Sequence, residues 1–255
     1  MKTIILAGGR GTRLTEETNV KPKPMVEIGG YPILWHIMKL YSFYDIKEFV
    51  IALGYKGGLI KGFFQNYHNY NTDFTVDLSS GNISRHNSHN EEWNVHLVDT
   101  GVETNTGGRI RRGMKYAGRE RVMATYGDGV GSINITKLLE FHKSHGKKAT
   151  LTAVRPPSRF GGLLFDGDQV VEFTEKPQIG EGWINGGFFV LEPEVAEYIE
   201  GDSSSFEGKP LENLAKDGQL MAYKHDGYWQ PMDTIREKNL LQELWESGKA
   251  PWKVW

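Results

Sequence analysis

Leu6-Ala7-Gly8-Gly9-Arg10-Gly11-Thr12-Arg13-Leu14 places a glycine-rich loop directly after an apolar run, Lys2–Ala7, that has the composition of a buried β-strand. Glycines lack a Cβ atom, so their backbone N–H groups can approach a polyphosphate closely. Two familiar phosphate-binding patterns fail here, because the dinucleotide fingerprint needs glycine at Leu14 and the Walker pattern needs Gly-Lys at Arg13-Leu14. A tight strand-to-helix turn without a ligand is therefore an equal alternative to a phosphate-binding loop.

The chain beyond this loop alternates β-rich runs with amphipathic runs. Strands are predicted at Lys2–Ala7, Glu48–Leu53, Val95–Val98, Val122–Tyr126 and Ala149–Val154, and helices at Pro32–Tyr44, Leu59–Tyr67, Arg109–Tyr116 and Ile135–His145. Such alternation predicts an α/β fold, a single Rossmann-like three-layer domain with a mostly parallel mixed sheet. Ligands bind outside the carboxyl ends of the strands in such sheets, which selects the loops 8–13, 99–109 and 127–129.

The pattern changes after residue 155, where a smaller lobe is expected to complete the same domain. We predict a hairpin at Gly162–Thr174 with its turn at 166–168, a strand at Gly186–Leu191, and helices at Pro193–Ile199 and Ile235–Ser247. Residues 66–93, rich in Asn, Ser and His, are predicted to form an excursion of short strands or loop at a subunit contact. A metal site at His68, His86 and His89 is disfavoured, because these histidines lack ligand spacing and accompanying carboxylates.

Composition and charge exclude several classes of protein. The 255 residues carry 30 Lys and Arg against 32 Asp and Glu, a formal charge of −2, without the basic footprint of a nucleic-acid or anionic-membrane binder. The chain has no cysteine, which excludes thiol nucleophiles, disulfides and thiolate zinc sites. Its apolar runs are too short for a membrane helix or a signal peptide. We therefore expect a cytoplasmic protein with no nucleic-acid or membrane partner.

A second basic motif follows the glycine loop. In Lys21-Pro22-Lys23-Pro24-Met25, each proline disfavours helix at the residue before it, so the lysines project from a stiff, extended backbone. A solvated basic loop is the plainer alternative. Further short motifs come later in the chain: Gly127-Asp128-Gly129, Glu175-Lys176-Pro177, Asn185-Gly186-Gly187 and Asp233.

Together and in this order, these motifs resemble the signature of the sugar-1-phosphate nucleotidyltransferases, over essentially the whole chain. Details point to a branch that uses CTP and glucose 1-phosphate: Glu16 stands where the family commonly has proline, Gly129 stands where many members have asparagine, and the late motif reads Tyr228-Trp229-Gln230-Pro231-Met232-Asp233-Thr234. The resemblance implies transfer of a cytidylyl group from CTP to α-D-glucose 1-phosphate, giving CDP-glucose and pyrophosphate. It makes 1–155 the nucleotide-binding half and 156–255 the sugar-binding half with a C-terminal tail.

The resemblance also implies roles for individual residues. Catalytic roles fall to Arg13, Lys23 and Asp128, and a bound Mg²⁺ would be held by Asp128 and Asp233. The sugar phosphate would be bound by Glu175, Lys176, Asn185 and Gly186. The nucleotide would be bound by Leu6, Ala7, Gly8, Gly9, Arg10, Gly11, Thr12, Arg13, Lys23, Thr104, Gly108, Arg109 and Gly127.

Three alternatives stay open at this point. The same chemistry could use UTP, dTTP or GTP, or another sugar phosphate, because backbone groups can read the base without leaving a side-chain signature. A relative with the same fold could bind a nucleotide sugar without turnover. A structural assembly protein would leave the glycine loop unexplained. The family resemblance further implies a homo-oligomer, a hexamer or a tetramer, and a place in O-antigen lipopolysaccharide biosynthesis.

Overall fold

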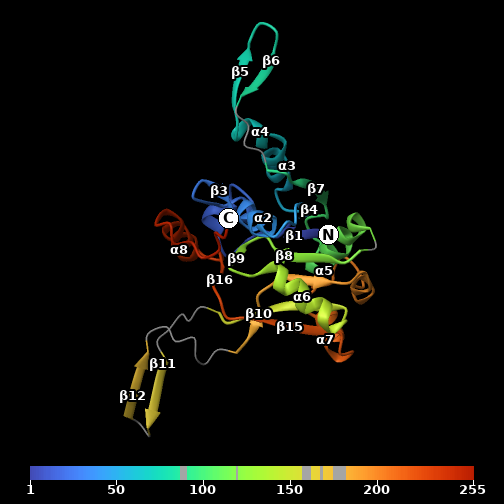
Figure 1. The fold of residues 1–255 in the computed structure, drawn as a ribbon, viewed down its shortest axis with the longest axis vertical. Helices are drawn as coiled ribbons and strands as arrows, with labels where there is room; N and C mark the ends of the chain where they lie inside the picture. Colours follow the sequence, from blue (N-terminus) through green and yellow to red (C-terminus); the bar gives the residue numbers. More distant parts are fainter. Residues whose placement is uncertain (87–90, 119, 157–161, 167–168, 175–181) are drawn as a thin grey trace.

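The computed structural model describes residues 1–86, 91–118, 120–156, 162–166, 169–174 and 182–255, and it contains one eight-stranded mixed sheet among them (Figure 1). The parallel part consists of β7 (Asn94–Asp99), β4 (Glu48–Leu53), β1 (Lys2–Ala7) and β8 (Val122–Tyr126), in that order across the sheet. Beyond β8 lie β14 (Phe189–Leu191), β10 (Ala149–Val154) and β15 (Leu220–His225); β14 is antiparallel to both of its neighbours. The α/β fold with a mostly parallel mixed sheet is therefore confirmed.

Helices cover both faces of this sheet, because alternate residues of its strands are apolar on opposite sides. Ile5 and Ile51 belong to one apolar cluster with the buried face of α2 (Ile33–Phe43) and Leu138 of α6 (Ile135–His145). On the other face, Ile4 and Val50 belong to a second apolar cluster, in which α5 (Thr106–Met114) packs on β1 and β4, and α7 (Lys209–Lys216) packs on β15. The result is the predicted three-layer arrangement, in which strands from both halves of the chain share one sheet.

Several predicted elements have different bounds in the structure. Helix α5 begins at Thr106 rather than Arg109, and Pro193–Tyr198 is a 3₁₀ helix. The extended backbone predicted at Lys23 is wrong, because Lys23–Met25 is a 3₁₀ helix, and Pro24 fits its first turn, where no N–H bond is lost. The predicted strand Gly186–Leu191 is wrong in its first half: β13 (Ile184–Asn185) and β14 are separate, because Gly187 (φ 78°) and Phe188 (φ 47°) are left-handed and interrupt the extended backbone. The sequence pattern also missed α7 and β15.

Residues 66–86 of the predicted excursion form an arm that projects from the body of the molecule (Figure 1), and residues 87–90 lie outside the described residues. Helices α3 (Gly57–Gln65) and α4 (Tyr67–Tyr70) lead into a hairpin of β5 (Asp73–Asp77) and β6 (Asn82–His86). Every residue of the two strands is exposed. The second hairpin, β11 (Gly162–Asp166) with β12 (Gln169–Thr174), forms where the sequence predicted it. No described helix has enough consecutive apolar residues to cross a bilayer.

Candidate active site

A cleft of about 420 Å³ opens at the carboxyl ends of the parallel strands, where the sequence placed the ligand site. It lies between the loop after β1, the loop that joins β7 to α5, and the loop after β8. Its walls are formed by Leu6, Gly8, Gly9, Arg10, Gly11, Thr12, Arg13, Lys23, Pro24, Val102, Glu103, Thr104, Asn105, Thr106, Arg109, Tyr126, Gly127 and Asp128. The three loops selected from the sequence thus line one cavity.

The glycine loop has two kinds of glycine. At Gly8 a Cβ atom would lie 2.0 Å from Nη1 of Arg109, so a side chain has no room. At Gly9 a Cβ atom would have no neighbour within 4 Å, and the backbone there is open to the cleft. Gly11 has a φ of 64° and stands close to Thr18, so it is required by the turn. Gly9 is therefore the glycine that leaves space for a ligand.

Arg109, which is 4 % exposed, joins the loop after β1 and the loop between β7 and α5 to the end of β4. Its Nη1 donates to the carbonyl of Leu53 (2.9 Å) and to Oγ1 of Thr100 (2.6 Å), and its Nη2 donates to the carbonyls of Gly8 (3.1 Å) and Val102 (3.2 Å). All four Nη hydrogens therefore go to protein acceptors. Burial lowers the pKa of this guanidinium from its usual high value, and the side chain remains a cation.

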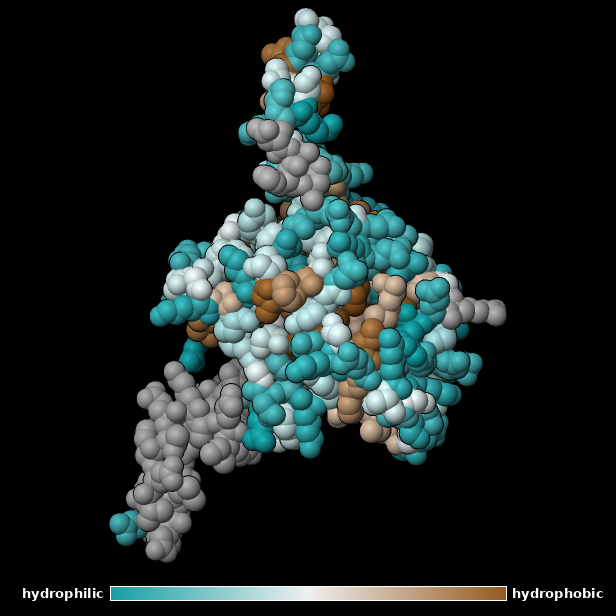
Figure 2. Space-filling view, in the orientation of Figure 1, coloured by the Kyte–Doolittle hydropathy of each residue, from teal (hydrophilic) through white to brown (hydrophobic). Residues whose placement is uncertain are grey.

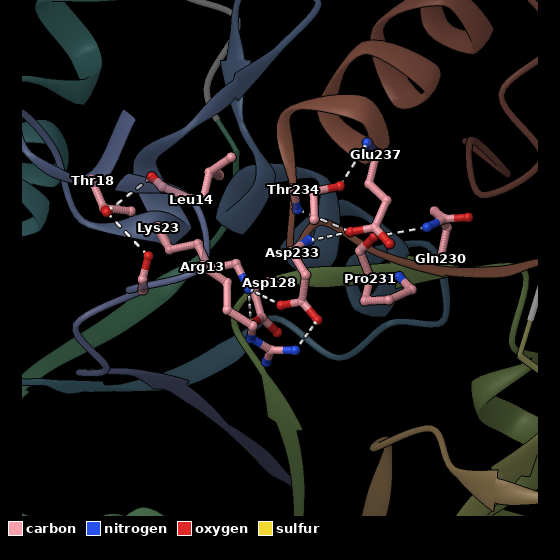
Figure 3. A network of polar contacts seen from close by, with 11 residues as sticks. Arg13, Leu14, Thr18, Lys23, Asp128, Gln230, Pro231, Asp233, Thr234 and Glu237 are labelled. Carbon is pink, nitrogen blue, oxygen red and sulfur yellow. Dashed lines mark hydrogen bonds and ion pairs between the residues drawn. The ribbon is translucent and has the colours of Figure 1, made fainter. Parts of the chain in front are cut away.

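Lys23 joins two carboxylates that are far apart in the sequence (Figure 3). Its Nζ donates to Oδ2 of Asp128 at 2.6 Å and to Oδ1 of Asp233 at 2.5 Å. The second oxygen of Asp233 is 2.7 Å from Nη1 of Arg13, whose side chain is mostly exposed. Burial lowers the pKa of Lys23, but the two carboxylates outweigh this effect and raise the pKa above its ordinary value. The ammonium is therefore charged at neutral pH.

A short two-stranded sheet brings the two carboxylates together. Strand β9 (Gly129–Gly131) follows Asp128 directly and pairs antiparallel with β16 (Trp229–Pro231), with Gly129 opposite Pro231. The N–H of Met232 donates to the carbonyl of Asp128 at 2.8 Å. Asp233 is the next residue, so this register fixes its distance from Asp128.

Helix α8 (Ile235–Glu246) then holds Asp233 in place. Thr234 and Glu237 form a capping box: Thr234 accepts from the N–H of Glu237, and Glu237 accepts from the N–H of Thr234. The same carboxylate of Glu237 also accepts from the N–H of Asp233 at 2.7 Å (Figure 3). The backbone of Asp233 is therefore held at both sides, by β16 and by the helix cap.

The sequence-predicted residues separate into those at the cleft and those elsewhere. Ala7 is buried at the end of β1, and Gly108 packs against Asp202, where a Cβ atom would lie 2.6 Å from Cα; neither lines the cleft. Asn185 and Gly186 lie beside Tyr126 and Trp229, with Asn185 Nδ2 3.1 Å from the Tyr126 hydroxyl and Trp229 Nε1 2.9 Å from the Gly186 carbonyl. Glu175 and Lys176 lie outside the described residues.

The donor set at Asp128 and Asp233 fits a hard, partly hydrated cation. No group of three or more His, Cys, Asp or Glu occurs among the residues that the structure describes, so these hold no dedicated all-protein cage. Two neighbouring carboxylates beside this cleft are the kind of ligands that Mg²⁺ takes from a protein, with substrate oxygens and water completing its shell.

Comparison with known proteins identifies the family. Residues 2–237 match the family model described as nucleotidyl transferase. The chain is 55 % identical to a glucose-1-phosphate cytidylyltransferase of Salmonella typhi and 45 % identical to a probable glucose-1-phosphate cytidylyltransferase of Bacillus subtilis, in each case over the whole of both chains. The chain belongs to the nucleotidyl transferase family. It is an enzyme of the nucleotidyltransferase class.

Solved structures share the fold of this nucleotidyltransferase. A UDP-glucose pyrophosphorylase complexed with UDP-glucose superposes with a TM-score of 0.70 at 16 % identity, covering 97 % of this chain and 98 % of the other. HddC from Yersinia pseudotuberculosis, complexed with GMP-PN, gives 0.69 at 24 % identity, covering 96 % and 99 %. At these identities the likeness concerns the fold alone.

Sequence reasoning missed six residues that line the cleft of this nucleotidyltransferase: Pro24, Val102, Glu103, Asn105, Thr106 and Tyr126. Four of them belong to the loop 99–109 that was selected as a whole, and Tyr126 directly precedes the selected Gly127. For these five residues the available signal was position at the carboxyl end of a strand. Pro24 instead stands in the motif Lys21-Pro22-Lys23-Pro24-Met25, beside the selected Lys23.

Proposed function

We propose that this nucleotidyltransferase transfers the cytidylyl group of CTP to α-D-glucose 1-phosphate and releases pyrophosphate. The full-length likeness to relatives named for this activity supports the substrates. The observation that carries the chemistry is the meeting of Arg13 and Lys23 with two carboxylates at a glycine-lined cleft. Cations and carboxylates so placed suit a reaction between two polyanions.

In the proposed reaction a phosphate oxygen of the sugar attacks the α-phosphorus of CTP in line, a P–O bond forms to the sugar phosphate, and the bond to pyrophosphate breaks. No protein nucleophile takes part, so the residues act by positioning and by charge. Lys23 exchanges its carboxylate partners for the α-phosphate and the sugar phosphate. Arg13 and the N–H groups from Gly8 to Thr12 hold the β- and γ-phosphates, because they border the same cleft.

Mg²⁺ belongs to this proposal, with Asp128 and Asp233 as its protein ligands. When bound, the cation would neutralise charge on the phosphates as the bond to pyrophosphate breaks. The two carboxylates are balanced by Lys23 and Arg13. Incoming phosphates give both cations new anionic partners, which frees carboxylate oxygens for the metal.

Base and sugar selection complete the proposal. Cytosine presents a donor at N4 and an acceptor at N3, so its site needs an acceptor and a donor in matching places. Thr104 and Arg109 border the cleft and are expected to contact the nucleotide, with the Nε–H of Arg109 as its remaining donor. Asn185 and Gly186, with Glu175 and Lys176, are assigned to the sugar phosphate. Unchanged KM values for CTP in both Thr104→Ala and Arg109→Ala would reject the base assignment.

The decisive experiment measures pyrophosphate release from glucose 1-phosphate and Mg²⁺ with CTP, UTP, dTTP or GTP. We expect release with CTP, and its loss in Asp128→Asn at a Mg²⁺ concentration that just saturates the wild type. A preference for UTP or dTTP would keep the chemistry and reject the cytosine assignment. Tight CTP binding without release from any nucleotide would favour the second candidate, a relative that binds nucleotide sugars without turnover.

The proposal includes self-association through the projecting arm. In the β5–β6 hairpin, Val76 pairs with Ile83 and Phe74 with Arg85, so the three apolar side chains share one face. They are 40–46 % exposed, and Leu78 at the turn is 91 % exposed. Figure 2 shows brown side chains on this arm. A lone two-stranded hairpin is marginally stable in water, which supports burial of this face against a second copy.

A further inference from the structure

A row of hydrogen bonds connects the nucleotide side of the cleft to the predicted sugar side, and Glu207 stands at its centre. One carboxylate oxygen of Glu207 accepts from the hydroxyl of Tyr126 at 2.7 Å. The other oxygen accepts from Oγ1 of Thr106 at 2.6 Å and from Oγ of Ser205 at 2.7 Å. Thr106 and Tyr126 line the cleft, whereas Glu207 does not.

The row continues from Tyr126 to the sugar side. Nδ2 of Asn185 donates to the Tyr126 hydroxyl at 3.1 Å, and Oδ1 of the same amide accepts from the N–H of Gly187 at 2.9 Å. Gly187 has a φ of 78°, and a Cβ atom there would lie 2.9 Å from the Tyr126 ring, so the turn packs directly against this tyrosine. Asn185 is thus held through its contacts with Tyr126 and Gly187.

The charge of Glu207 fixes the direction of every bond in the row. Partial desolvation alone would raise the pKa of Glu207, but hydrogen bonds from Thr106, Ser205 and Tyr126 outweigh it and lower the pKa. The carboxylate is therefore ionised and can only accept. Tyr126 must then give its one hydrogen to Glu207, so its oxygen can only accept from Asn185. Asn185 keeps its second Nδ2 hydrogen for another acceptor.

We infer that Glu207 is a positioning residue, which orients Tyr126 and, through it, the Asn185 amide that meets the sugar. This inference rests on the proposed function, because it assigns the remaining Asn185 hydrogen to a sugar hydroxyl. Glu207 also holds Thr106, at the first turn of α5. The same carboxylate thereby ties a wall of the nucleotide site to the sugar site.

Glu207→Gln tests the assignment, because glutamine keeps the size of the side chain and can donate as well as accept. The Tyr126 hydroxyl and the Asn185 amide can then reverse their bonds. We expect the KM for glucose 1-phosphate to rise about tenfold, the loss of roughly one hydrogen bond to the substrate. The KM for CTP should change less, since Thr106 still finds an acceptor in the glutamine oxygen.

A double-mutant cycle separates positioning from mere stability. Tyr126→Phe removes the intermediary hydroxyl, so adding Glu207→Gln to it should raise the KM for glucose 1-phosphate little further. Matched controls are Tyr198→Phe, which removes an exposed hydroxyl bonded to Asp217 at 2.9 Å, and Glu200→Gln, an exposed carboxylate in the same region. Both controls should keep wild-type KM values. Melting temperatures of all variants show whether each is folded at the assay temperature.

The outcomes are distinct. If the wild type is active and Glu207→Gln has an unchanged KM for glucose 1-phosphate, the inference is overturned and the proposed function stands. The same holds if the KM of the double variant rises by the product of the two single-variant factors. A folded wild type without pyrophosphate release from any nucleotide overturns the proposed function and the inference with it. If Glu207→Gln fails to fold, Tyr126→Phe decides: a wild-type KM for the sugar phosphate in that variant overturns the inference.

Discussion

The guanidinium of Arg109 lies directly against the backbone of Gly8, with Nη2 3.1 Å from the Gly8 carbonyl and Nη1 where a side chain of residue 8 would begin. The same guanidinium bonds the end of β4 and the loop after β7. One cation thus holds together three strand-end loops whose sequences are unrelated. Gly8 is glycine because Arg109 occupies its side-chain space.

This relationship predicts opposite results for two neighbouring glycines. In Gly8→Ala the new methyl group collides with Arg109, so the free energy of unfolding should fall by about 2 kcal/mol or more, as for an overpacked site. In Gly9→Ala the methyl group meets no protein atom, so stability should hold while the KM for CTP rises. Urea unfolding and CTP kinetics measure both; equal stability in the two variants would contradict the packing argument.

Lys23→Ala should abolish most turnover without unfolding the protein. The substitution removes the ammonium that bridges Asp128 and Asp233 and that we propose to contact the reacting phosphates, so we expect kcat to fall by about a hundredfold or more. Lys21→Ala is the matched control, because Lys21 pairs with Glu27 at 2.9 Å outside the cleft. Comparable losses in both variants would reject a specific role for Lys23.

The proposed Mg²⁺ site at Asp128 and Asp233 predicts that activity depends on the metal. Asp128→Asn and Asp233→Asn should each raise the Mg²⁺ concentration needed for half-maximal pyrophosphate release, because each removes one anionic ligand. Asp233→Asn should also loosen Arg13, its partner at 2.7 Å. Full activity of the wild type in the presence of EDTA would contradict the magnesium proposal.

Glu237→Ala should reduce both stability and activity. It leaves the N–H groups of Asp233 and Thr234 without their acceptor, and loss of such a cap costs about 1 kcal/mol of unfolding free energy. Activity should fall more than stability alone explains, because Asp233 loses a constraint. Glu243→Ala, at an exposed position of the same helix, is the control. Unchanged kcat in a folded Glu237→Ala would show that the cap does not position Asp233.

His36 predicts how stability depends on pH. Burial lowers its pKa to about 4, and its ring lies between the Ile28 carbonyl (2.8 Å) and Nε1 of Trp252 (3.3 Å). Below pH 6.5 His36 is protonated in the unfolded chain, whereas in the folded protein it stays neutral until about pH 4. Stability should therefore fall with decreasing pH in this window, by about 2 kcal/mol between pH 7 and 5 from this residue.

Urea unfolding at pH 7 and pH 5 measures that dependence. In His36→Gln the change between the two pH values should be smaller than in the wild type by about this amount. His86→Gln, on the exposed hairpin, should keep the wild-type dependence. An unaltered dependence in His36→Gln would show that this ring is not the group responsible.

The arm predicts the oligomeric state. Val76→Asp together with Ile83→Asp places two charges on the shared apolar face and should shift the protein to a 29 kDa species in light scattering. Ser84→Asp, on the opposite face of the same strand, should leave the assembly intact, because only alternate residues share a face. A wild-type protein that is already a 29 kDa monomer would reject self-association.

The sequence by itself determined the alternation of elements and the loops that carry chemistry. Strands such as Glu48–Leu53 and helix Ile135–His145 were predicted at their observed bounds, because their apolar periodicity is local. Position at strand ends selected the cleft, and a shared motif order selected Lys23, Asp128 and Asp233. Local signals failed where neighbours impose the backbone, as at Gly187 and Phe188, which turn left-handed against Tyr126.

Only the tertiary structure decided which of these residues contact one another. Asp128 and Asp233 meet through the pairing of β9 with β16, more than one hundred residues apart, and no local pattern encodes that register. The hydrogen bonds from Arg109 to the carbonyls of Gly8, Leu53 and Val102 are not encoded in a local sequence pattern either. Buried polar groups must find partners wherever the fold brings them, so their roles follow from packing and not from residue type.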